Sequence, residues 1–534
     1  MEIDKKIISW KEFDDSFTGV VLTFEPTKEF TADSKRPSIF PGLIRRLQKS
    51  KPQLTIAVLA GILMTIPGLM IPIFSKVFID NYLIKGMEDW VLPLILIMSA
   101  TAVVNAALNF LQQHYLLKME NTIAINESSK LFWHIVRLPM DFFNQRMAGE
   151  IGNRISLNDN VAMVISGQLA TNIIGIFSIV MYAILMLYYD VMLTLVGVSF
   201  VLINIFIFKR IIKNISLKSK KLSIEQGKLI GVSMSGLQSI ETLKASGSEN
   251  DFFIKWSGTQ AKMQNATNEM VMLNQSSIII PVLFTAVNIA IILIFGSLRV
   301  MDGFMTIGML VAFQSLMQNF SAPINALMGL GATIKDLEGD MNHLDDVLKY
   351  PVQDNSSDSN ETLIQAKLIG KVELNNLTFG YSKLAPPLIE NLSLTIKPGK
   401  TVAVIGSSGS GKSTIAKIVT GLYKQWDGKI LFDDTNIDDV NNKIITNSVA
   451  MVDQDISLFK GTIKENISLW DDSISDEEII LACKDACIHD FIASLPDAYN
   501  TMISEGGNNF SGGQKQRIEI ARAFVNNPTI LVLD

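Results

Sequence analysis

Residues 406–414 have the types and spacing of a phosphate-binding loop. They read GSSGSGKST and satisfy the pattern G-x-x-x-x-G-K-[ST]. The glycines permit a backbone path that turns successive N–H groups toward phosphate oxygens. The lysine places a cation on the β- and γ-phosphates of a nucleotide, and the serine after it offers a hydroxyl to Mg²⁺. The predicted ATP site therefore contains Gly406, Ser407, Ser408, Gly409, Ser410, Gly411, Lys412, Ser413 and Thr414.

Two further side chains fit the metal of such a site. Asp534 follows the apolar run TILVL, and a phosphate-loop domain needs a carboxylate at a neighbouring strand end to hold Mg²⁺. Gln454, in MVDQDISLF, lies at an expected strand-to-loop transition, where its amide could touch the metal and sense the γ-phosphate. Ser413, Gln454 and Asp534 are the candidate metal ligands, and ATP and Mg²⁺ are the expected cofactors.

The segment FSGGQKQR offers a second place for phosphate. Ser511, Gly512, Gly513 and Gln514 stand at the start of an apparent helix, whose N–H groups favour an anion. A second loop of this kind cannot easily reach the first loop's nucleotide within one small domain, so it would serve a nucleotide held by another copy. The alternative is an ordinary helix start with Ser511 as the cap.

A soluble α/β domain is needed to position these residues. KVELNNLTFGY, from Lys371, and LSLTIKPGKTVAVIG, ending at Gly406, alternate or run apolar with β-branched residues, which predicts strands. The strand KTVAVIG would lead into the phosphate loop, and a helix from near Lys412 would add its positive N-terminal end. The polar stretch PVQDNSSDSNET reads as a linker.

Most of the remaining chain is typical of a membrane protein. Hydrophobic residues make up 48% of the 534 residues and charged residues 18%. Apolar runs that reach or approach the length of a bilayer span are predicted near 54–79, 91–117, 163–188, 191–211, 276–299 and 304–328. The net charge of −6 shows no basic excess, and no nucleic-acid partner is expected.

Lysine and arginine set the expected orientation of these spans. They concentrate before the first span and in the two long loops, whereas the opposite loops hold Lys85 and little else. Both ends of the chain and the long loops are therefore predicted to be cytoplasmic. The long loops read mostly as helix, so we expect the membrane helices to continue into the cytoplasm and turn back at DFFNQRMAGEIGNR and EQGKLIGVSMSG.

The two cysteines, Cys483 and Cys487, lie in LACKDACIHD. His489 is near them, but no fourth ligand is evident, so a metal site is not favoured. We expect instead a helix that carries two small apolar residues at positions i and i+4.

These motifs, in this order, resemble the nucleotide-binding domain of an ABC transporter. In that family Gly406–Thr414 correspond to the Walker A loop, Gln454 to the Q-loop and Ser511–Gln514 to the signature sequence. Asp534 corresponds to the Walker B aspartate, and Tyr381, in FGYSK, to an aromatic residue that stacks on adenine. The alternative for Tyr381 is a core strand tyrosine. Six spans ahead of one such domain resemble the half-transporter layout of a type I exporter.

The resemblance implies the fold class and the domains. The fold would be a six-helix, all-α membrane domain over residues 38–350, a linker over 351–370 and an α/β phosphate-loop domain over 371–534. GLQSIETLKASGSENDFFIKW, MDGFMTIGMLVAFQSLM and MVDQDISLFKGTIKENI resemble exporters of bacteriocin-type peptides, in the group that handles nitrile-hydratase-like leader peptides. ISWKEFDDSFTGVVLTFEPTKEF resembles the closing strands of their papain-like peptidase domain, so residues 1–37 would be a remnant of it. With no cysteine before Cys483, no peptidase nucleophile is present.

The resemblance also predicts what the chain would lack. In the family a glutamate that polarises the attacking water follows the residue matched by Asp534, and a histidine that contacts the γ-phosphate comes later. The chain is therefore expected to be cut at both ends, to be inactive as an ATPase as written, and to have no certain catalytic residue, with Gln454 and Asp534 only supporting.

The expected function is ATP-driven export of a ribosomally made, leader-bearing peptide across a bacterial cytoplasmic membrane by two copies of the chain. The alternatives are a lipid or drug exporter with the same architecture, and a fragment that binds nucleotide without hydrolysing it. Polar residues inside the predicted spans could line a peptide path or hydrogen-bond between helices; they are Asn105, Asn109, Gln112, Gln113, Asn288, Gln314, Gln318 and Asn319.

Overall fold

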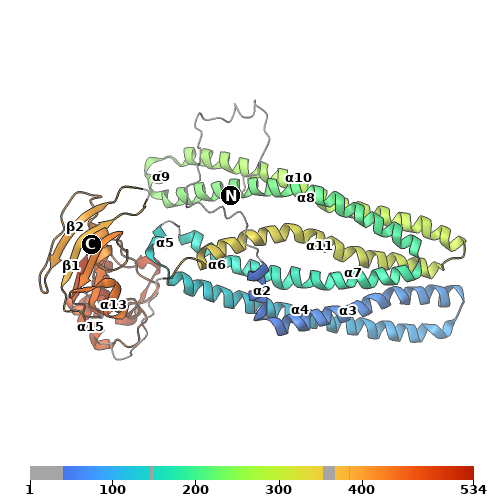
Figure 1. Cartoon of the computed structure of the whole chain (residues 1–534), viewed down its shortest axis with the longest axis horizontal. Helices are drawn as coiled ribbons and strands as arrows, with labels where there is room; N and C mark the ends of the chain where they lie inside the picture. Colours follow the sequence, from blue (N-terminus) through green and yellow to red (C-terminus); the bar gives the residue numbers. More distant parts are fainter. Residues whose placement is uncertain (1–39, 145, 147, 353–366, 384) are drawn as a thin grey trace. The chain divides into compact units, whose positions relative to one another are not determined.

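The computed structural model describes residues 40–144, 146, 148–352, 367–383 and 385–534 (Figure 1). The chain divides into two compact units, Met1–Lys49 and Ser50–Asp534. In the first unit the described element is the helix α2 (Phe40–Gln48). The predicted peptidase remnant over residues 1–37 lies outside the described residues.

The larger unit begins with a bundle of long helices. Its elements are α3 (Lys51–Val77), η1 (Phe78–Ile84), η2 (Glu88–Trp90), α4 (Val91–Val136), α5 (Met140–Asn144), α6 (Ala148–Met163), η3 (Val164–Leu169), α7 (Ala170–Tyr189), α8 (Val191–Gln238), α9 (Ile240–Ser246), α10 (Glu249–Met301) and α11 (Ile307–Leu348). A bilayer span needs about 20 residues, and α4, α8 and α10 have 46, 48 and 53. The prediction that spans continue as helix beyond the membrane is therefore confirmed.

Five helical segments are long and apolar enough to cross a membrane, by length and composition, among the residues that could be searched. They are Lys51–Ile84, Glu88–Val136, Gly149–Tyr189, Val191–Arg210 and Ile279–Met301. The sixth predicted span, 304–328, forms the first half of α11 but is not among them. Gln314, Gln318 and Asn319 lower its hydropathy, although α11 packs against α3 and α7 as a member of the bundle.

The bundle is held together by apolar packing and by polar contacts between helices. Met186, Leu193, Phe313 and Leu316, each at most 2% exposed, form part of the apolar core of the bundle. Farther along the chain, α8 and α10 lie side by side (Figure 1). Lys218 Nζ of α8 donates to Glu269 Oε2 of α10 at 2.6 Å.

One end of the bundle contains two buried carboxylates. Asp190 accepts from the Leu193 N–H at 2.9 Å as the N-cap of α8, and its other oxygen accepts from Arg299 Nη2 at 2.6 Å. Asp80 in η1 accepts from the Thr306 hydroxyl at 2.5 Å and from the Gly308 N–H at 2.9 Å. Each carboxylate thus ties one helix end to a helix distant in sequence.

The second cytoplasmic turning point differs from the prediction. EQGKLIGVSMSG lies inside α8, and the chain turns back through α9, which ends at Gly247 with a φ of +64°. The prediction of a turn at 225–236 was wrong because the glycines there lie in helical backbone. A glycine in the left-handed region, which terminates a helix, comes only at Gly247.

The soluble part contains strands β1 (Val372–Phe379), β2 (Ile389–Ile396), β3 (Asp427–Phe432), β4 (Thr435–Asn436), β5 (Val449–Val452), β6 (Gly461–Thr462), β7 (Met502–Ile503) and β8 (Ile530–Leu533). Its helical segments are α12 (Lys412–Val419), η5 (Ile437–Asp439), α13 (Asn442–Ser448), α14 (Ile463–Ser468), α15 (Asp476–Asp485), α16 (His489–Ala493), η6 (Ala498–Asn500), η7 (Glu505–Gly507) and α17 (Gly512–Phe524). The order β2-β1-β3-β4 is antiparallel, whereas β5 and β8 pair in parallel.

The soluble part has two apolar cores. Leu377, Ile418 and Phe432, each fully buried, lie in the core that joins the antiparallel sheet to α12. A separate cluster, which includes Ile463, Cys483 and Ile518, joins α14, α15 and α17. The α/β character predicted from the sequence is confirmed.

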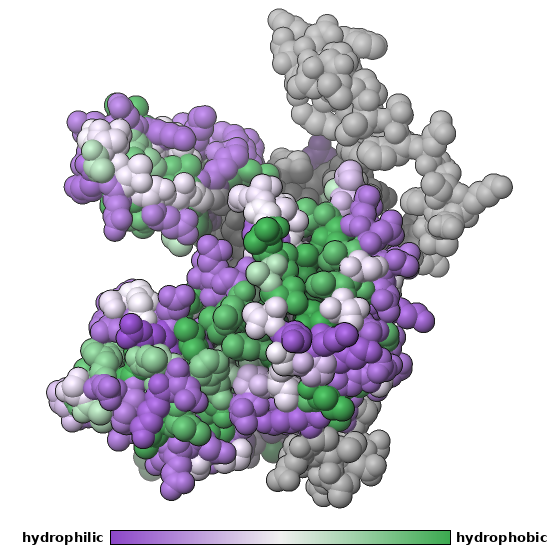
Figure 2. All heavy atoms as spheres, turned by 90° about the vertical axis from the view of Figure 1, so that its left-hand side faces the viewer, coloured by the Kyte–Doolittle hydropathy of each residue, from purple (hydrophilic) through white to green (hydrophobic). Residues whose placement is uncertain are grey.

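The predicted strand KTVAVIG is not formed as a strand. Residues 401–407 have no regular secondary structure, and Ile405 is 91% exposed. A strand requires hydrogen-bonded neighbours, and among the described strands β8 pairs with β5 rather than with this segment. Figure 2 shows hydrophobic surface between hydrophilic patches on the side that carries the soluble part. Among the apolar residues of the soluble part, Val404 and Leu533 are exposed.

Candidate nucleotide-binding site

The phosphate loop has the backbone that its glycines were predicted to allow. Gly409 and Gly411 have φ of +81° and +89°, in the left-handed region that favours glycine. Between them the Ser410 N–H donates to the Ser407 carbonyl at 3.3 Å, which closes a tight turn. The loop ends at α12, as predicted, so it lies at the N-terminal end of a helix.

Lys412 folds back over this loop. Its Nζ donates to the carbonyl oxygens of Ser407 at 2.8 Å and Gly406 at 3.1 Å. The ammonium group therefore lies against the loop at the start of α12, where the helix dipole also favours an anion. A cation and N–H groups at one place can hold the negative oxygens of a nucleotide phosphate.

Ser413 and Asp534 are brought together from positions 121 residues apart. The Ser413 hydroxyl donates to Asp534 Oδ1 at 2.8 Å, and the Asp534 N–H donates to the Val452 carbonyl at 3.0 Å. The parallel pair of β5 and β8 thus fixes the carboxylate opposite the first turn of α12. A hydroxyl and a carboxylate are the hard oxygen ligands that Mg²⁺ prefers, so these two residues fit a magnesium ion.

Gln454 lies near the same sheet edge. It follows β5 by two residues, as predicted for a strand-to-loop transition, and it is exposed. Because Val452 is in register with Leu533, Gln454 and Asp534 leave neighbouring strands at the same end. Within the part of the chain that the structure describes, no group of three His, Cys, Asp or Glu side chains could hold a metal ion. A metal here would rely on Ser413, Asp534 and Gln454 together with phosphate oxygens.

Tyr381 lies beside the phosphate loop. Its hydroxyl is 2.9 Å from the hydroxyl of Thr414, and its ring contacts those of Phe379 and Tyr423 edge-on. Tyr381 comes after the end of β1 and is 53% exposed, so it is not a core strand residue. The position fits an aromatic face available to a base, and stacking on adenine stays a prediction.

The segment Ser511–Gln514 forms a capping box at the start of α17. The Ser511 hydroxyl accepts from the Gln514 N–H at 3.3 Å, and Gln514 Oε1 accepts from the Ser511 N–H at 2.8 Å. The alternative reading of Ser511 as a helix cap is therefore confirmed. The cap uses the N–H groups of Ser511 and Gln514, so phosphate binding by this segment would depend on those of Gly512 and Gly513, and it stays a prediction.

The predicted first turning point lies next to the soluble part. The Tyr423 hydroxyl donates to Asn144 Oδ1 at 3.0 Å, and Asn144 is the last residue of α5. Tyr423 follows α12 and touches Tyr381, which is itself beside the loop. A short series of contacts thus joins the phosphate loop to the helical bundle. Sequence reasoning missed Tyr423, because a tyrosine in GLYKQW has no motif around it.

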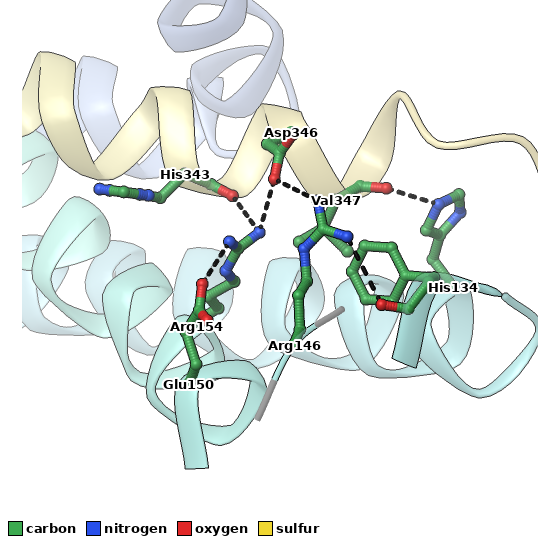
Figure 3. Close-up of polar contacts among 8 residues, drawn as sticks. His134, Arg146, Glu150, Arg154, His343, Asp346 and Val347 are labelled. Carbon is green, nitrogen blue, oxygen red and sulfur yellow. Dashed lines mark hydrogen bonds and ion pairs between the residues drawn. The ribbon is translucent and has the colours of Figure 1, made fainter. Parts of the chain in front are cut away.

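A cluster of charged residues at the cytoplasmic end of the bundle was also missed (Figure 3). Arg154 of α6 is 6% exposed, and it donates to Asp346 Oδ2 of α11 at 3.0 Å and to Glu150 Oε1 at 2.8 Å. Arg146 donates to the same Asp346 oxygen at 3.3 Å. The hydrogen bond from Arg154 holds the pKa of Asp346 below its ordinary value, although partial burial opposes this.

The predicted intramembrane polar residues do not form one continuous group. Gln112 and Asn288 are buried, whereas Asn109, Gln113 and Gln318 are exposed, and the rest are half-buried. Asn288 lines a small pocket between α8, α10 and α11 together with two other asparagines, Asn204 and Asn325. The structure does not join the predicted residues into a path for a peptide.

A bundle of membrane helices followed by a phosphate-loop domain defines the class of an ABC transporter, and the comparisons agree. Residues 54–324 match the family described as ABC transporter transmembrane region, and residues 389–534 match the family described as ABC transporter. The first match covers half of the chain, and the protein belongs to the ABC transporter family.

Individual relatives are secretion proteins. The leukotoxin translocation ATP-binding protein LktB of a Pasteurella haemolytica-like species is 27% identical over 99% of this chain and 74% of the relative. The colicin V secretion/processing ATP-binding protein CvaB of Escherichia coli is 28% identical over 99% of this chain and 76% of the relative. A bacterial Atm1-family ABC exporter with ATP bound has a similar structure, with a TM-score of 0.75 and 25% identity over 91% of this chain and 85% of the other.

The protein is therefore an ATP-driven exporter of the type I class, with a multi-pass membrane part and a cytoplasmic nucleotide-binding domain.

Proposed function

We propose that the protein exports a ribosomally made, leader-bearing peptide of the bacteriocin type across the cytoplasmic membrane of a bacterium. The observation that supports ATP as the driving ligand is the Ser413–Asp534 pair beside the Lys412 loop. The cargo is supported by the relatives, whose names describe translocation of leukotoxin and secretion of colicin V.

The chain's own residues have distinct roles in this proposal. Lys412 and the loop N–H groups hold the phosphates, while Ser413, Asp534 and Gln454 hold Mg²⁺. The metal neutralises charge on the β- and γ-phosphates when it is bound. Tyr381 offers an aromatic face to the base. A change in the loop on nucleotide binding would be transmitted to the helical bundle through the contacts of Tyr423 with Tyr381 and with Asn144.

Two copies of the chain would complete each nucleotide site. The N–H groups of Gly512 and Gly513, with the Ser511 hydroxyl as a further donor, would face the γ-phosphate held by the other copy, because the Ser511 N–H already donates to Gln514. A test uses Ser408→Cys and Ser511→Cys in one chain whose native cysteines are replaced by serine. We expect a disulfide-linked dimer that forms faster with ATP, and a monomer under all conditions would contradict the two-copy site.

A transport assay identifies the cargo. The chain extended through the glutamate and the histidine that the family resemblance predicts would be reconstituted in proteoliposomes and given ATP and a fluorescent peptide that carries a double-glycine leader, with Lys412→Ala as the matched control. Accumulation of the peptide inside vesicles, where outward-facing nucleotide domains pump inward, supports the proposal. ATP-dependent movement of a fluorescent lipid or a drug, with no movement of the peptide, would favour the lipid or drug exporter instead.

A further inference from the structure

The C-terminal end of α11 is held by side chains from other helices (Figure 3). The last turn of α11 has no basic residue of its own, although the C-terminal end of a helix carries partial negative charge that a cation stabilises. The donors come instead from the cytoplasmic ends of α4 and α6 and from the segment between α5 and α6. These side chains act in addition to the Lys349 N–H that caps the helix, and they position its end relative to the other helices.

Three side chains reach this end of α11. Arg154 donates to the His343 carbonyl at 3.3 Å as well as to Asp346. His134 Nε2, near the end of α4, lies 3.0 Å from the Val347 carbonyl, which makes the ring nitrogen the donor. Arg146 completes the group through the Asp346 oxygen that it shares with Arg154.

We propose that Asp346 is a positioning residue, which fastens the end of α11 to the cytoplasmic hairpin of α4, α5 and α6 so that they move as one unit. We call this group of contacts, made by His134, Arg146 and Arg154 with α11, the α11 latch. It matters because α5 touches the nucleotide-binding part through Asn144 and Tyr423. A movement that reaches α5 is then passed to α11 directly.

The exposure of the two partners suits this role. The Arg154 side chain is 7% exposed, whereas the Asp346 side chain is 51% exposed. When the Asp346 charge is removed, the buried Arg154 guanidinium keeps the Glu150 carboxylate and the His343 carbonyl as partners, so it is not left as an unpaired buried charge. Removing the Asp346 charge should therefore change the geometry of the hairpin without unfolding the bundle, and the latch can be tested in a folded protein.

The test measures a distance across the latch. Spin labels are placed at Asn160→Cys on α6 and Asn342→Cys on α11, both exposed, in a chain with Cys483→Ser and Cys487→Ser. Pulsed electron paramagnetic resonance in lipid nanodiscs then gives the distance distribution with and without MgATP. We expect one narrow distribution in both conditions, because the two elements move together.

Substitutions separate the latch from general packing. Asp346→Asn should produce a second, longer distance in about a tenth of the molecules, the upper end of the population expected for a minor state. Asp346→Glu should restore the narrow distribution. Glu150→Gln is the matched control, because Glu150 also pairs with Arg154 but lies on the same helix. Arg154→Lys should also produce the second distance, since a lysine ammonium cannot reproduce the fixed fork of the guanidinium, which bonds Asp346 through Nη1 and Glu150 through Nη2.

Two outcomes would overturn the α11 latch: a distribution in Asp346→Asn that equals that of the parent chain, or a parent distance that changes with MgATP. The proposal rests on the exporter class and not on the cargo. Affinity for a fluorescent ATP analogue is measured in parallel and should differ by less than about twofold between the parent chain and Asp346→Asn, because the contacts of Asp346 to Arg146 and Arg154 lie outside the nucleotide site. Loss of nucleotide binding by the parent chain would contradict the ATP-driven function, while the nucleotide-free distances would still test the latch.

Discussion

Lys412 is the residue with the clearest predicted effect on nucleotide binding. Its ammonium group contacts two loop carbonyls and lies at the start of α12. Lys412→Ala should weaken MgATP affinity by about 10- to 100-fold, the size expected for loss of a hydrogen bond to a charged group. Titration of a fluorescent ATP analogue measures this, with Lys400→Ala as a control that keeps the same charge change outside the loop. Equal affinities would refute the phosphate-loop assignment.

The two cysteines give a matched pair for a chemical test. Burial raises the pKa of the Cys483 thiol to about 11, whereas Cys487 is exposed. Only the thiolate reacts quickly with a maleimide or iodoacetamide. Labelling is done on the folded protein at pH 7.5, where about a tenth of an ordinary thiol is ionised. Cys487→Ser should therefore abolish most of the labelling, whereas Cys483→Ser should leave it unchanged. Mass spectrometry after brief labelling reads the result, and rapid modification of Cys483 would contradict its burial.

The same thiol predicts a dependence of stability on alkaline pH. A pKa raised from 9.0 to about 11 means that the folded protein holds the proton more tightly than the unfolded protein does. This contribution to the free energy of unfolding is complete below pH 9 and is lost as the pH rises toward 11. Burial also raises the pKa of Tyr499 beside it, which acts in the same direction. Between pH 8 and pH 11, the midpoint temperature of thermal unfolding should fall less steeply in Cys483→Ala than in the parent chain.

At the scale of elements, Asp190 combines two contacts that substitutions can separate. It caps α8 and pairs with Arg299 of α10. Asp190→Asn keeps a capping oxygen and removes the ion pair. It should lower the free energy of unfolding by about 3 kcal/mol, because the Arg299 charge is left without its partner. Asp190→Ala should cost about 1 kcal/mol more for the lost cap. Asp302→Asn, at an exposed position nearby, is the control for thermal unfolding in nanodiscs.

The sequence predicted the elements that depend on local pattern. The phosphate loop, the strand from Val372, the helix from Lys412 and the long helices beyond the membrane all follow from periodicity or from a motif. The segment 400–406 was wrongly predicted as a strand because alternation gives propensity, whereas a strand exists only with a paired neighbour. The turn at Gly247 was missed because glycines inside α8 looked equally suitable.

The residues that were missed act at long range. Asp346 and Tyr423 bond to residues 192 and 279 positions away in the chain. Residue spacing within a short segment cannot predict partners so far away in the chain. Each of these residues alone looks like an ordinary surface or core residue. The Ser413–Asp534 contact was anticipated only because both residues belong to motifs with known roles.

At the scale of the whole molecule, the topology is the main prediction that awaits measurement. Lys85 is exposed at the end of η1, in a loop expected outside the cytoplasm. In the chain without native cysteines, Lys85→Cys should react with a membrane-impermeant maleimide added to intact cells. Ser239→Cys, in the turn after α8, should react only after the membrane is opened. The opposite pattern would invert the proposed orientation.

The pair of α8 and α10 has a mechanical consequence. At 1.5 Å per residue the 53 residues of α10 extend about 80 Å. The Lys218–Glu269 hydrogen bond joins α8 and α10 outside their apolar, membrane-spanning segments. A rigid rod acts as a lever: a tilt of about 5° at one end of α10 moves its other end by about 7 Å for this length. The length of this pair converts a small rotation at one end of the bundle into a displacement of several ångströms at the other.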